Sequence, residues 1–219
     1  MKIPFLLLAL TTLAFAQTPF TDPRDGKTYK TVKIGEQVWM GENLNYYVSS
    51  SRCYDNKSTN CEIYGRLYSW ETAMKICPEG WHLPSETEWD KLITAIGGKN
   101  KAGKALKTKN GWRDYKGISS NGEDAYGFSA LPGGYYGCSD GGYDNCYFDD
   151  YFISISYNKN PYGCSKEDFG IVGHHGNWWS SKEYFFYEAY GYSMNSCNAK
   201  VYLNLSYKTE LHSARCVQD

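Results

Sequence analysis

The chain has 219 residues with an almost neutral formal charge of −1, a length that suits one domain with a core of its own. Basic residues do not cluster enough to indicate a nucleic-acid partner or an anionic membrane surface, so these function classes are excluded. Aromatic residues reach 17%, more than a core needs, so we expect many tyrosines at the surface.

Residues 1–16 have the features of a secretory signal peptide. Lys2 precedes an apolar run at 3–10, and Ala14-Phe15-Ala16 is a small-residue cleavage site. The apolar run is too short to span a bilayer, and no cysteine follows the cleavage site to carry a lipid anchor. We therefore expect residues 17–219 to form a single secreted domain, located outside the cell, at its surface or in the periplasm, without membrane insertion.

The first predicted elements are a hairpin and a helix. Residues 28–34 and 37–40 alternate and are separated by a turn, which is typical of two paired strands. After a polar, loop-like stretch, a helix is predicted roughly over residues 65–75, with Leu67, Trp70 and Met74 on its apolar face. It ends before Pro78, because proline cannot continue a helix.

The second predicted helix carries the clearest signals. Ser85 and Glu88 have the spacing of a capping box, in which each side chain accepts a hydrogen bond from the other residue's backbone N–H. Apolar residues then recur with helical spacing, which indicates a core-facing stripe; they are Trp89, Leu92, Ile93 and Ile96. The lysine-rich segment 99–109 that follows is expected to be a solvated loop or helix end.

Residues 133–176 form the most unusual region, rich in aromatic, glycine and acidic residues. A long ordered loop on a rigid scaffold is a common place for binding, although residues 152–157 also alternate like a strand. Tyrosine combines an apolar face with a hydroxyl, which suits carbohydrate rings or a protein partner; the alternative is that most of these rings pack under the loop. The candidate binding residues are Tyr135, Tyr136, Tyr143, Tyr147, Asp149, Asp150 and Tyr151.

The final third of the chain is predicted to be antiparallel sheet. The candidate strands are residues 177–181, 187–195, 199–206 and 213–217.

Five blocks of sequence resemble the Fibrobacter succinogenes major paralogous domain, a family of secreted bacterial proteins of unassigned function. The blocks are QVWMGENL at 37–44, CPEGWHLPSETEW at 77–89, GFSALPGG at 127–134, WWSS at 178–181 and SARCV at 213–217. A more distant likeness is to the formylglycine-generating enzymes, through residues 81–89 and 215–217. This resemblance implies an α+β, C-type lectin-like fold, with two helices against short antiparallel sheets and long disulfide-stapled loops.

Eight cysteines after a signal peptide imply an oxidising destination and up to four disulfides. Two pairs bracket short polar loops and look like local staples. The lectin-like resemblance implies a third pair that ties the ends of the domain together, and elimination leaves the fourth. The expected pairs are Cys53 with Cys61, Cys138 with Cys146, Cys77 with Cys216, and Cys164 with Cys197.

Catalytic and metal sites are not expected. A formylglycine-type centre needs a pair of reactive cysteines, and every cysteine here has a structural partner. His174 and His175 are adjacent, so on an extended chain they point to opposite faces and indicate a structural or flexible loop. The motifs of calcium-dependent lectins are missing. Asp149 and Asp150 are the alternative, an oxygen-ligand calcium site, but a solvated acidic loop is simpler.

The sequence therefore predicts a secreted, non-catalytic binding module that recognises a glycan or cell-surface polymer through the loops of residues 133–176. One alternative is a structural or adhesion protein that binds cell-surface proteins by the same tyrosines. A weaker alternative is an oxidative modifying enzyme of the formylglycine-generating type.

Overall fold

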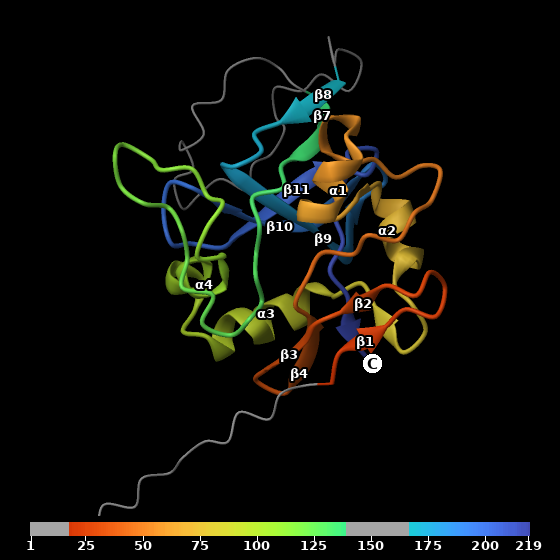
Figure 1. Ribbon diagram of the computed structural model, residues 1–219, viewed down its shortest axis with the longest axis horizontal. Coiled ribbons are helices and arrows are strands. Elements are labelled where there is room, and N and C mark those ends of the chain that lie inside the picture. The colour runs from red at the N-terminus through yellow and green to blue at the C-terminus, as the bar shows by residue number, and fades with distance from the viewer. Residues whose placement is uncertain (1–17, 139–166) are drawn as a thin grey trace, which may run out of the picture.

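The computed structural model describes residues 18–138 and 167–219. The described chain has a mixed α+β fold in which helices pack against a five-stranded and a four-stranded sheet, with two further strand pairs (Figure 1). The predicted strand at 152–157 lies outside the described residues.

The five-stranded sheet is built from the last third of the chain and one earlier strand. Its order is β11 (Tyr202–Tyr207), β10 (Glu188–Asn195), β9 (His175–Phe185), β12 (His212–Ser213) and β5 (Leu67–Tyr68). All neighbours are antiparallel except β12 and β9. The first three predicted strands are confirmed as β9, β10 and β11, and β9 is longer than predicted. The predicted strand at 213–217 is wrong, because Ser213 ends β12, which lies parallel to β9, and Val217 begins a strand of the other large sheet.

The four-stranded sheet joins the two ends of the described chain. Its order is β3 (Thr31–Ile34), β4 (Gln37–Met40), β13 (Val217–Gln218) and β6 (Trp81–His82). The remaining strand pairs are β1 (Phe20–Thr21) with β2 (Thr28–Tyr29), and β7 (Tyr135–Cys138) with β8 (Glu167–Gly170). The predicted hairpin is confirmed as β3 and β4.

Four α-helices occur in the described residues, where the sequence predicted two. They are α1 (Ser58–Tyr64), α2 (Trp70–Ile76), α3 (Glu86–Ala95) and α4 (Lys99–Leu106), with a short 3-10 helix, η1, at Tyr54–Asn56. The capping box of α3 is present as predicted: Ser85 Oγ accepts from the Glu88 N–H, and the Glu88 carboxylate accepts from the Ser85 N–H.

The prediction for the first long helix was wrong in its start and its buried face. Leu67 belongs to β5, because its strand pairs with β12, and the helix begins only after Ser69, whose hydroxyl caps it. Met74 is exposed, whereas Trp70 packs partly buried against the core as predicted, and the side chains that α2 buries fully are Ala73 and Ile76. Tertiary strand pairing therefore decides where this helix begins.

The lysine-rich segment is a packed helix rather than a solvated loop. Ala102 and Leu106 are fully buried on α4. Gly103 lets the backbone of Ala199 and Lys200 approach closely, since a Cβ there would lie 2.5 Å from the Lys200 carbonyl oxygen. Because the residues at this contact are small, one side of α4 packs closely against the chain at 199–200 and is buried, although the helix carries several lysines.

Tryptophan rings fill the centre between the sheets and α3. Trp89 of α3 stacks on Tyr192 of β10 with ring centroids 4.8 Å apart, and Trp39 of β4 lies 5.1 Å from Trp89. All three rings are buried, so α3 is fixed to both large sheets at once.

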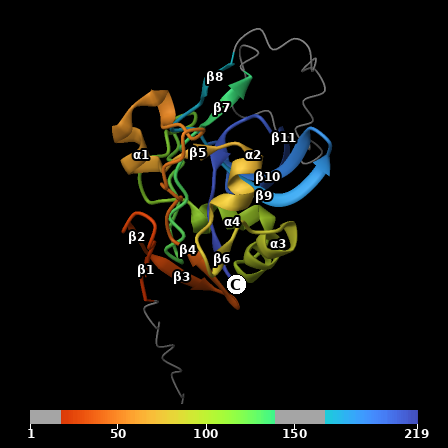
Figure 2. The same cartoon turned by 90° about the vertical axis from the view of Figure 1, so that its right-hand side faces the viewer.

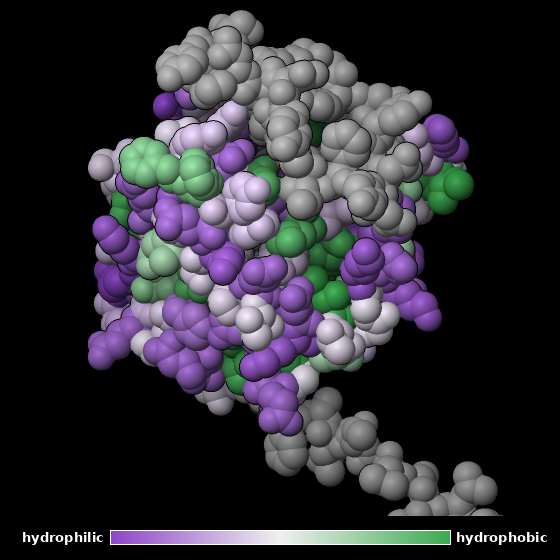
Figure 3. Space-filling model, turned by 180° about the vertical axis from the view of Figure 1, so that it is seen from behind, coloured by the Kyte–Doolittle hydropathy of each residue, from purple (hydrophilic) through white to green (hydrophobic). Residues whose placement is uncertain are grey.

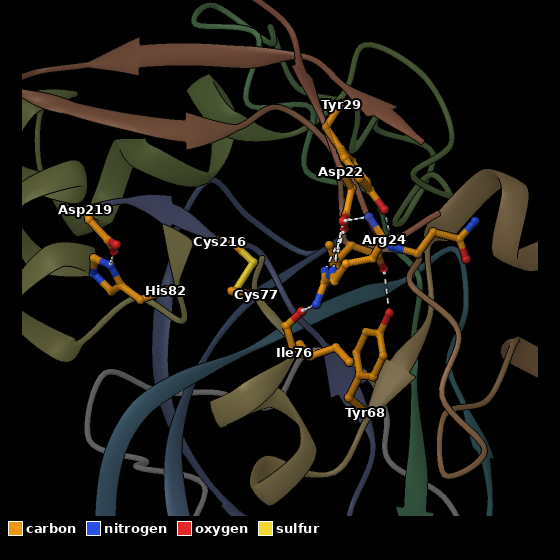
Figure 4. The surroundings of a disulfide bond; sticks show 11 residues. Asp22, Arg24, Tyr29, Tyr68, Ile76, Cys77, His82, Cys216 and Asp219 are labelled. Atoms are coloured by element: carbon orange, nitrogen blue, oxygen red, sulfur yellow. Dashed lines mark hydrogen bonds and ion pairs between the residues drawn. A yellow bond between two sulfur atoms is a disulfide. The ribbon is translucent and has the colours of Figure 1, made fainter. Parts of the chain in front are cut away.

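Two of the predicted disulfides are confirmed. Cys53 pairs with Cys61, and Cys77 at the end of α2 pairs with Cys216 beside β13 (Figure 4). Cys197 is also disulfide-bonded. The predicted pair of Cys138 with Cys146, and the predicted partner Cys164, fall outside the side chains that the structure describes.

Candidate functional site

Two of the predicted binding tyrosines lie on the short sheet of β7 and β8, at one end of the protein (Figures 1 and 2). Tyr135 and Tyr136 pair with Gly170 and Phe169 of β8. Because neighbouring residues of a strand point to opposite faces, the two tyrosines have different surroundings. The other predicted binding residues lie outside the described residues; they are Tyr143, Tyr147, Asp149, Asp150 and Tyr151.

Tyr136 is surrounded by charged and aromatic side chains. Its hydroxyl donates a hydrogen bond to Glu167 Oε2 at 3.1 Å, and the guanidinium carbon of Arg52 lies 4.5 Å from its ring centroid. Phe169 meets the ring edge-on at 4.9 Å and packs in turn against Tyr54. Slight burial and the bond to Glu167 raise the pKa of Tyr136, so the phenol stays neutral. We call Tyr136, Arg52, Glu167 and Phe169 the Tyr136 surface, while Tyr54 is buried.

Tyr135 points the other way, toward the main sheet. Its ring centroid lies 6.1 Å from that of His212, and the ring covers Gly170, where a Cβ would come within 2.5 Å of it. The side chain is half-buried. Tyr135 therefore packs β7 and β8 against the five-stranded sheet and supports the Tyr136 surface from beneath.

A buried acid–base pair lies next to Tyr135. His212 stacks on Trp179 with ring centroids 4.2 Å apart, and its Nε2 lies 3.4 Å from Glu210 Oε2. Burial raises the pKa of nearby Glu188, and the carboxylate of Glu210 adds to the rise. The His212 and Glu210 side chains are only 5% and 9% exposed, so an incoming substrate does not reach them. Their position suits packing of the turn between β11 and β12.

Sequence reasoning missed the exposed end of the β9–β10 hairpin. Four consecutive aromatic residues, Tyr184, Phe185, Phe186 and Tyr187, are all exposed there. We call residues 184–187 the hairpin tip. The signal in the sequence was an unbroken aromatic run, which does not alternate with polar residues as a half-buried strand does.

Beneath these surfaces, four of the sequence blocks quoted above meet at one buried hydrogen-bond network. Asn43 Oδ1 accepts hydrogen bonds from Trp178 Nε1 at 2.8 Å and from Arg215 Nη2 at 2.6 Å. The Arg215 guanidinium also donates to the Phe128 carbonyl and lies 4.2 Å from the Phe128 ring centroid. Burial lowers the pKa of Arg215, yet a guanidinium remains charged in proteins. The blocks therefore meet at a structural centre.

The family model of the Fibrobacter succinogenes major domain matches residues 32–218. The chain belongs to this family. The match takes in the sequence blocks and both large sheets, so this Fibrobacter succinogenes major domain accounts for most of the chain. No curated protein and no solved structure matches the chain.

Within residues 18–138 and 167–219, no group of three or more His, Cys, Asp or Glu side chains is placed to hold a metal ion. No helix in 18–138 or 167–219 is long and apolar enough to cross a membrane. Asp149 and Asp150, the alternative calcium ligands, lie outside these ranges.

Proposed function

We propose that this Fibrobacter succinogenes major domain is a secreted, non-catalytic binding module for a glycan or a cell-surface polymer. The observation that carries the proposal is the Tyr136 surface, where an aromatic ring lies between the guanidinium of Arg52 and the carboxylate of Glu167. The C–H faces of sugar rings pack on aromatic rings, while guanidinium and carboxylate groups exchange hydrogen bonds with sugar hydroxyls.

The position of this surface supports the proposal. β7 and β8 flank the tyrosine-rich stretch that contains Tyr143, Tyr147 and Tyr151, so the Tyr136 surface stands where that stretch leaves and rejoins the sheet. The buried contacts of Tyr135 with Gly170 and His212 hold the strand pair in place. A preorganised surface loses less entropy when it binds a ligand.

We propose further that the fold is C-type lectin-like. Support comes from three features: strands from both ends of the described chain share one sheet, a disulfide ties α2 to the last strand, and the sequence between β7 and β8 is a long insertion. The two confirmed disulfides are consistent with a secreted protein.

The proposal that the module is non-catalytic rests on two observations. The acid–base pair of His212 and Glu210 is buried, with side chains only 5% and 9% exposed. The described cysteines form disulfides. Cys216, in the segment that resembles the formylglycine-generating enzymes, is bonded to Cys77 and carries no free thiolate. Cys53, Cys61 and Cys197 are likewise disulfide-bonded. A cysteine redox centre needs thiols that these residues do not supply.

Binding of the disulfide-intact protein to a panel of soluble and insoluble polysaccharides, with and without calcium, tests the proposal. Tyr136→Ala should weaken the binding about tenfold or more, because truncating an aromatic side chain at the centre of a binding surface typically costs above 1 kcal/mol. Tyr126→Ala is the matched control, since Tyr126 is exposed next to Gly127, which packs on Val32 of β3. β3 lies at the end of the protein opposite β7 and β8 (Figure 1).

Equal binding by both variants would contradict a role for the Tyr136 surface. No binding to any polysaccharide by the folded protein would overturn the glycan proposal and favour a protein partner. A calcium requirement would direct attention to Asp149 and Asp150.

A further inference from the structure

The hairpin tip extends beyond the described body of the protein, and its side chains are exposed. Side chains of β9 up to Ser180 are buried except that of Asn177, which is half-buried, whereas every residue from 182 to 187 is exposed. Phe186, at the turn, is 87% exposed. Figure 2 shows the joined ends of β9 and β10 reaching past the helices at the side of the protein.

Aromatic side chains contact one another around this tip. The Tyr184 ring contacts Tyr190 of β10 at 5.3 Å, while the Phe185 ring contacts Tyr187 at 5.8 Å and Tyr187 lies 6.0 Å from Tyr207 of β11. The strand register pairs Glu188 with both Phe185 and Tyr207, and Tyr190 follows Glu188 by two residues, so Phe185, Tyr190 and Tyr207 point to one face of the sheet. The tip is therefore an aromatic cluster in which Phe186, at the turn, is the most exposed side chain.

Charges around the tip cancel. Lys208 forms an ion pair with Glu183, and its Nζ donates a hydrogen bond to the Phe186 carbonyl at 2.9 Å, which holds the turn in place. The other charged neighbours, Lys182 and Glu188, have opposite signs. Electrostatic attraction to an anionic partner is therefore weak, and apolar burial is the main source of any binding energy here.

The exposed area is small for a protein–protein interface. With about 200 Å² for each side chain, exposed fractions of 48–87% correspond to roughly 500 Å² over residues 184–187. A stable interface buries about 800 Å² on each partner. On the rear face, Figure 3 shows hydrophobic residues in small groups separated by polar ones, so the coloured part of that face adds no broad apolar area.

We propose that the hairpin tip contacts a lipid bilayer at its interface. Phe185 and Phe186 enter the boundary between headgroups and acyl chains, and the hydroxyls of Tyr184 and Tyr187 remain at the headgroup level. Phenylalanine at the end of the turn and tyrosine on both sides give the polarity gradient of that boundary. The contact is peripheral, through a hairpin tip, and differs from the membrane spans that the sequence argued against.

Co-sedimentation of the disulfide-intact protein with phosphatidylcholine vesicles tests this proposal. The double variant Phe185→Ser/Phe186→Ser should lower the partition coefficient about tenfold or more, because two phenylalanine side chains no longer leave water. Ile118→Ser is the matched control, since Ile118 is 72% exposed in a different loop, and it should bind like the unmodified protein. Added phosphatidylglycerol or salt should change the binding less than twofold, because the tip carries no net charge.

A second variant reports where the tip lies. Phe186→Trp should be quenched by vesicles with brominated acyl chains more strongly than the unmodified protein, in which Trp70 lies against Lys208, with the Lys208 Nζ 4.7 Å from the Trp70 ring centroid. The proposal is overturned if the unmodified protein does not sediment with vesicles, or if the double variant binds equally well. Self-association that the double variant abolishes, without vesicle binding, would overturn it in favour of an interface between copies of this chain.

Discussion

At the residue scale, Lys107 shows how the fold changes side-chain chemistry. Its Nζ donates hydrogen bonds to the carbonyl oxygens of Asn195 at 3.0 Å and Asn198 at 2.9 Å, and lies 4.9 Å from the Trp112 ring centroid. The residue is only 2% exposed. Burial, with a smaller contribution from Lys104, lowers the pKa of Lys107 to about 8.

This lowered pKa predicts that stability depends on pH. The unfolded chain binds the Lys107 proton up to its ordinary pKa of 10.5, whereas the folded chain releases it near 8, so the free energy of unfolding rises with pH between these values. Relative to Lys107→Met, the unmodified protein should gain about 1–2 kcal/mol between about pH 7.5 and 9.5. Urea unfolding at both pH values measures the gain.

The control for this experiment is Lys101→Met, on the exposed side of α4, the helix that ends just before Lys107. That variant should keep the pH dependence of the unmodified protein. If the free energies of unfolding of Lys107→Met and the unmodified protein differ by the same amount at both pH values, the lowered pKa is contradicted.

Sequence reasoning placed Lys107 in a solvated run because it counts charges along the chain. The carbonyl oxygens that accept hydrogen bonds from its ammonium group belong to Asn195 and Asn198, about ninety positions later, and no local sequence pattern indicates them. Tyr136 was predicted as a binding residue from composition alone. Its partners Arg52 and Glu167 are distant in sequence and only the fold brings them together.

At the scale of elements, the capping box of α3 extends into a longer chain of hydrogen bonds. Glu88 Oε1 lies 2.7 Å from His82 Nε2, and His82 Nδ1 lies 2.6 Å from Asp219 Oδ1 (Figure 4 shows the His82–Asp219 contact). Burial lowers the pKa of His82, but the hydrogen bonds to Asp219 and Glu88 outweigh it, so the pKa is raised overall. The protonated imidazole thus links α3, β6 and the residue after β13.

The raised pKa of His82 predicts an opposite pH dependence. The contribution of His82 to the free energy of unfolding is fully present below the ordinary histidine pKa of 6.5. It is lost as pH rises through the raised pKa of the folded protein, since a neutral imidazole donates only one hydrogen bond. His82→Gln should lower the free energy of unfolding by about 0.5–1 kcal/mol at pH 6, a small loss because the imidazole is partly exposed. At pH 9 the loss should be close to nothing.

Urea unfolding of His82→Gln at the two pH values measures this loss. His174→Gln is the control, because burial lowers the pKa of His174 and its replacement should not reproduce the trend. An equal cost of His82→Gln at both pH values would show that the imidazole acts without its charge.

Element predictions succeeded where the signals were local. α3 has an N-cap residue, a capping box and an apolar stripe within twelve residues, and each of these signals acts within the helix itself. α1 has no side-chain cap, and it is held by the disulfide of Cys61 with Cys53. The hairpin tip was missed because its exposure depends on how far β9 and β10 extend beyond the sheet, and sequence patterns do not report that distance.

At the scale of the whole molecule, the two described disulfides close loops of very different length. Cys77 and Cys216 are 139 residues apart, whereas Cys53 and Cys61 are separated by 8. A crosslink restricts the unfolded chain more when its loop is longer. Replacing Cys77 and Cys216 with alanine should therefore lower the free energy of unfolding by roughly 2 kcal/mol more than replacing Cys53 and Cys61.

Urea unfolding of the two double variants, each with the other disulfides intact, measures this difference. A larger loss from the short loop would indicate that local packing around η1 and α1 outweighs the loop-length effect. The two pairings were predictable for different reasons. The spacing of Cys53 and Cys61 in the sequence indicates a short disulfide loop, whereas the pairing of Cys77 with Cys216 was expected only from the resemblance to a lectin-like fold.

The central claim is that the Tyr136 surface binds a glycan by its aromatic ring. The most direct measurement compares the Kd of the unmodified protein, Tyr136→Phe and Tyr136→Ala for the polysaccharide that the panel identifies. Tyr136→Phe keeps the ring and loses the hydrogen bond to Glu167, so it should retain affinity within about threefold, whereas Tyr136→Ala should lose about tenfold or more. Unchanged affinity in Tyr136→Ala, or equal losses in both variants, would contradict the claim.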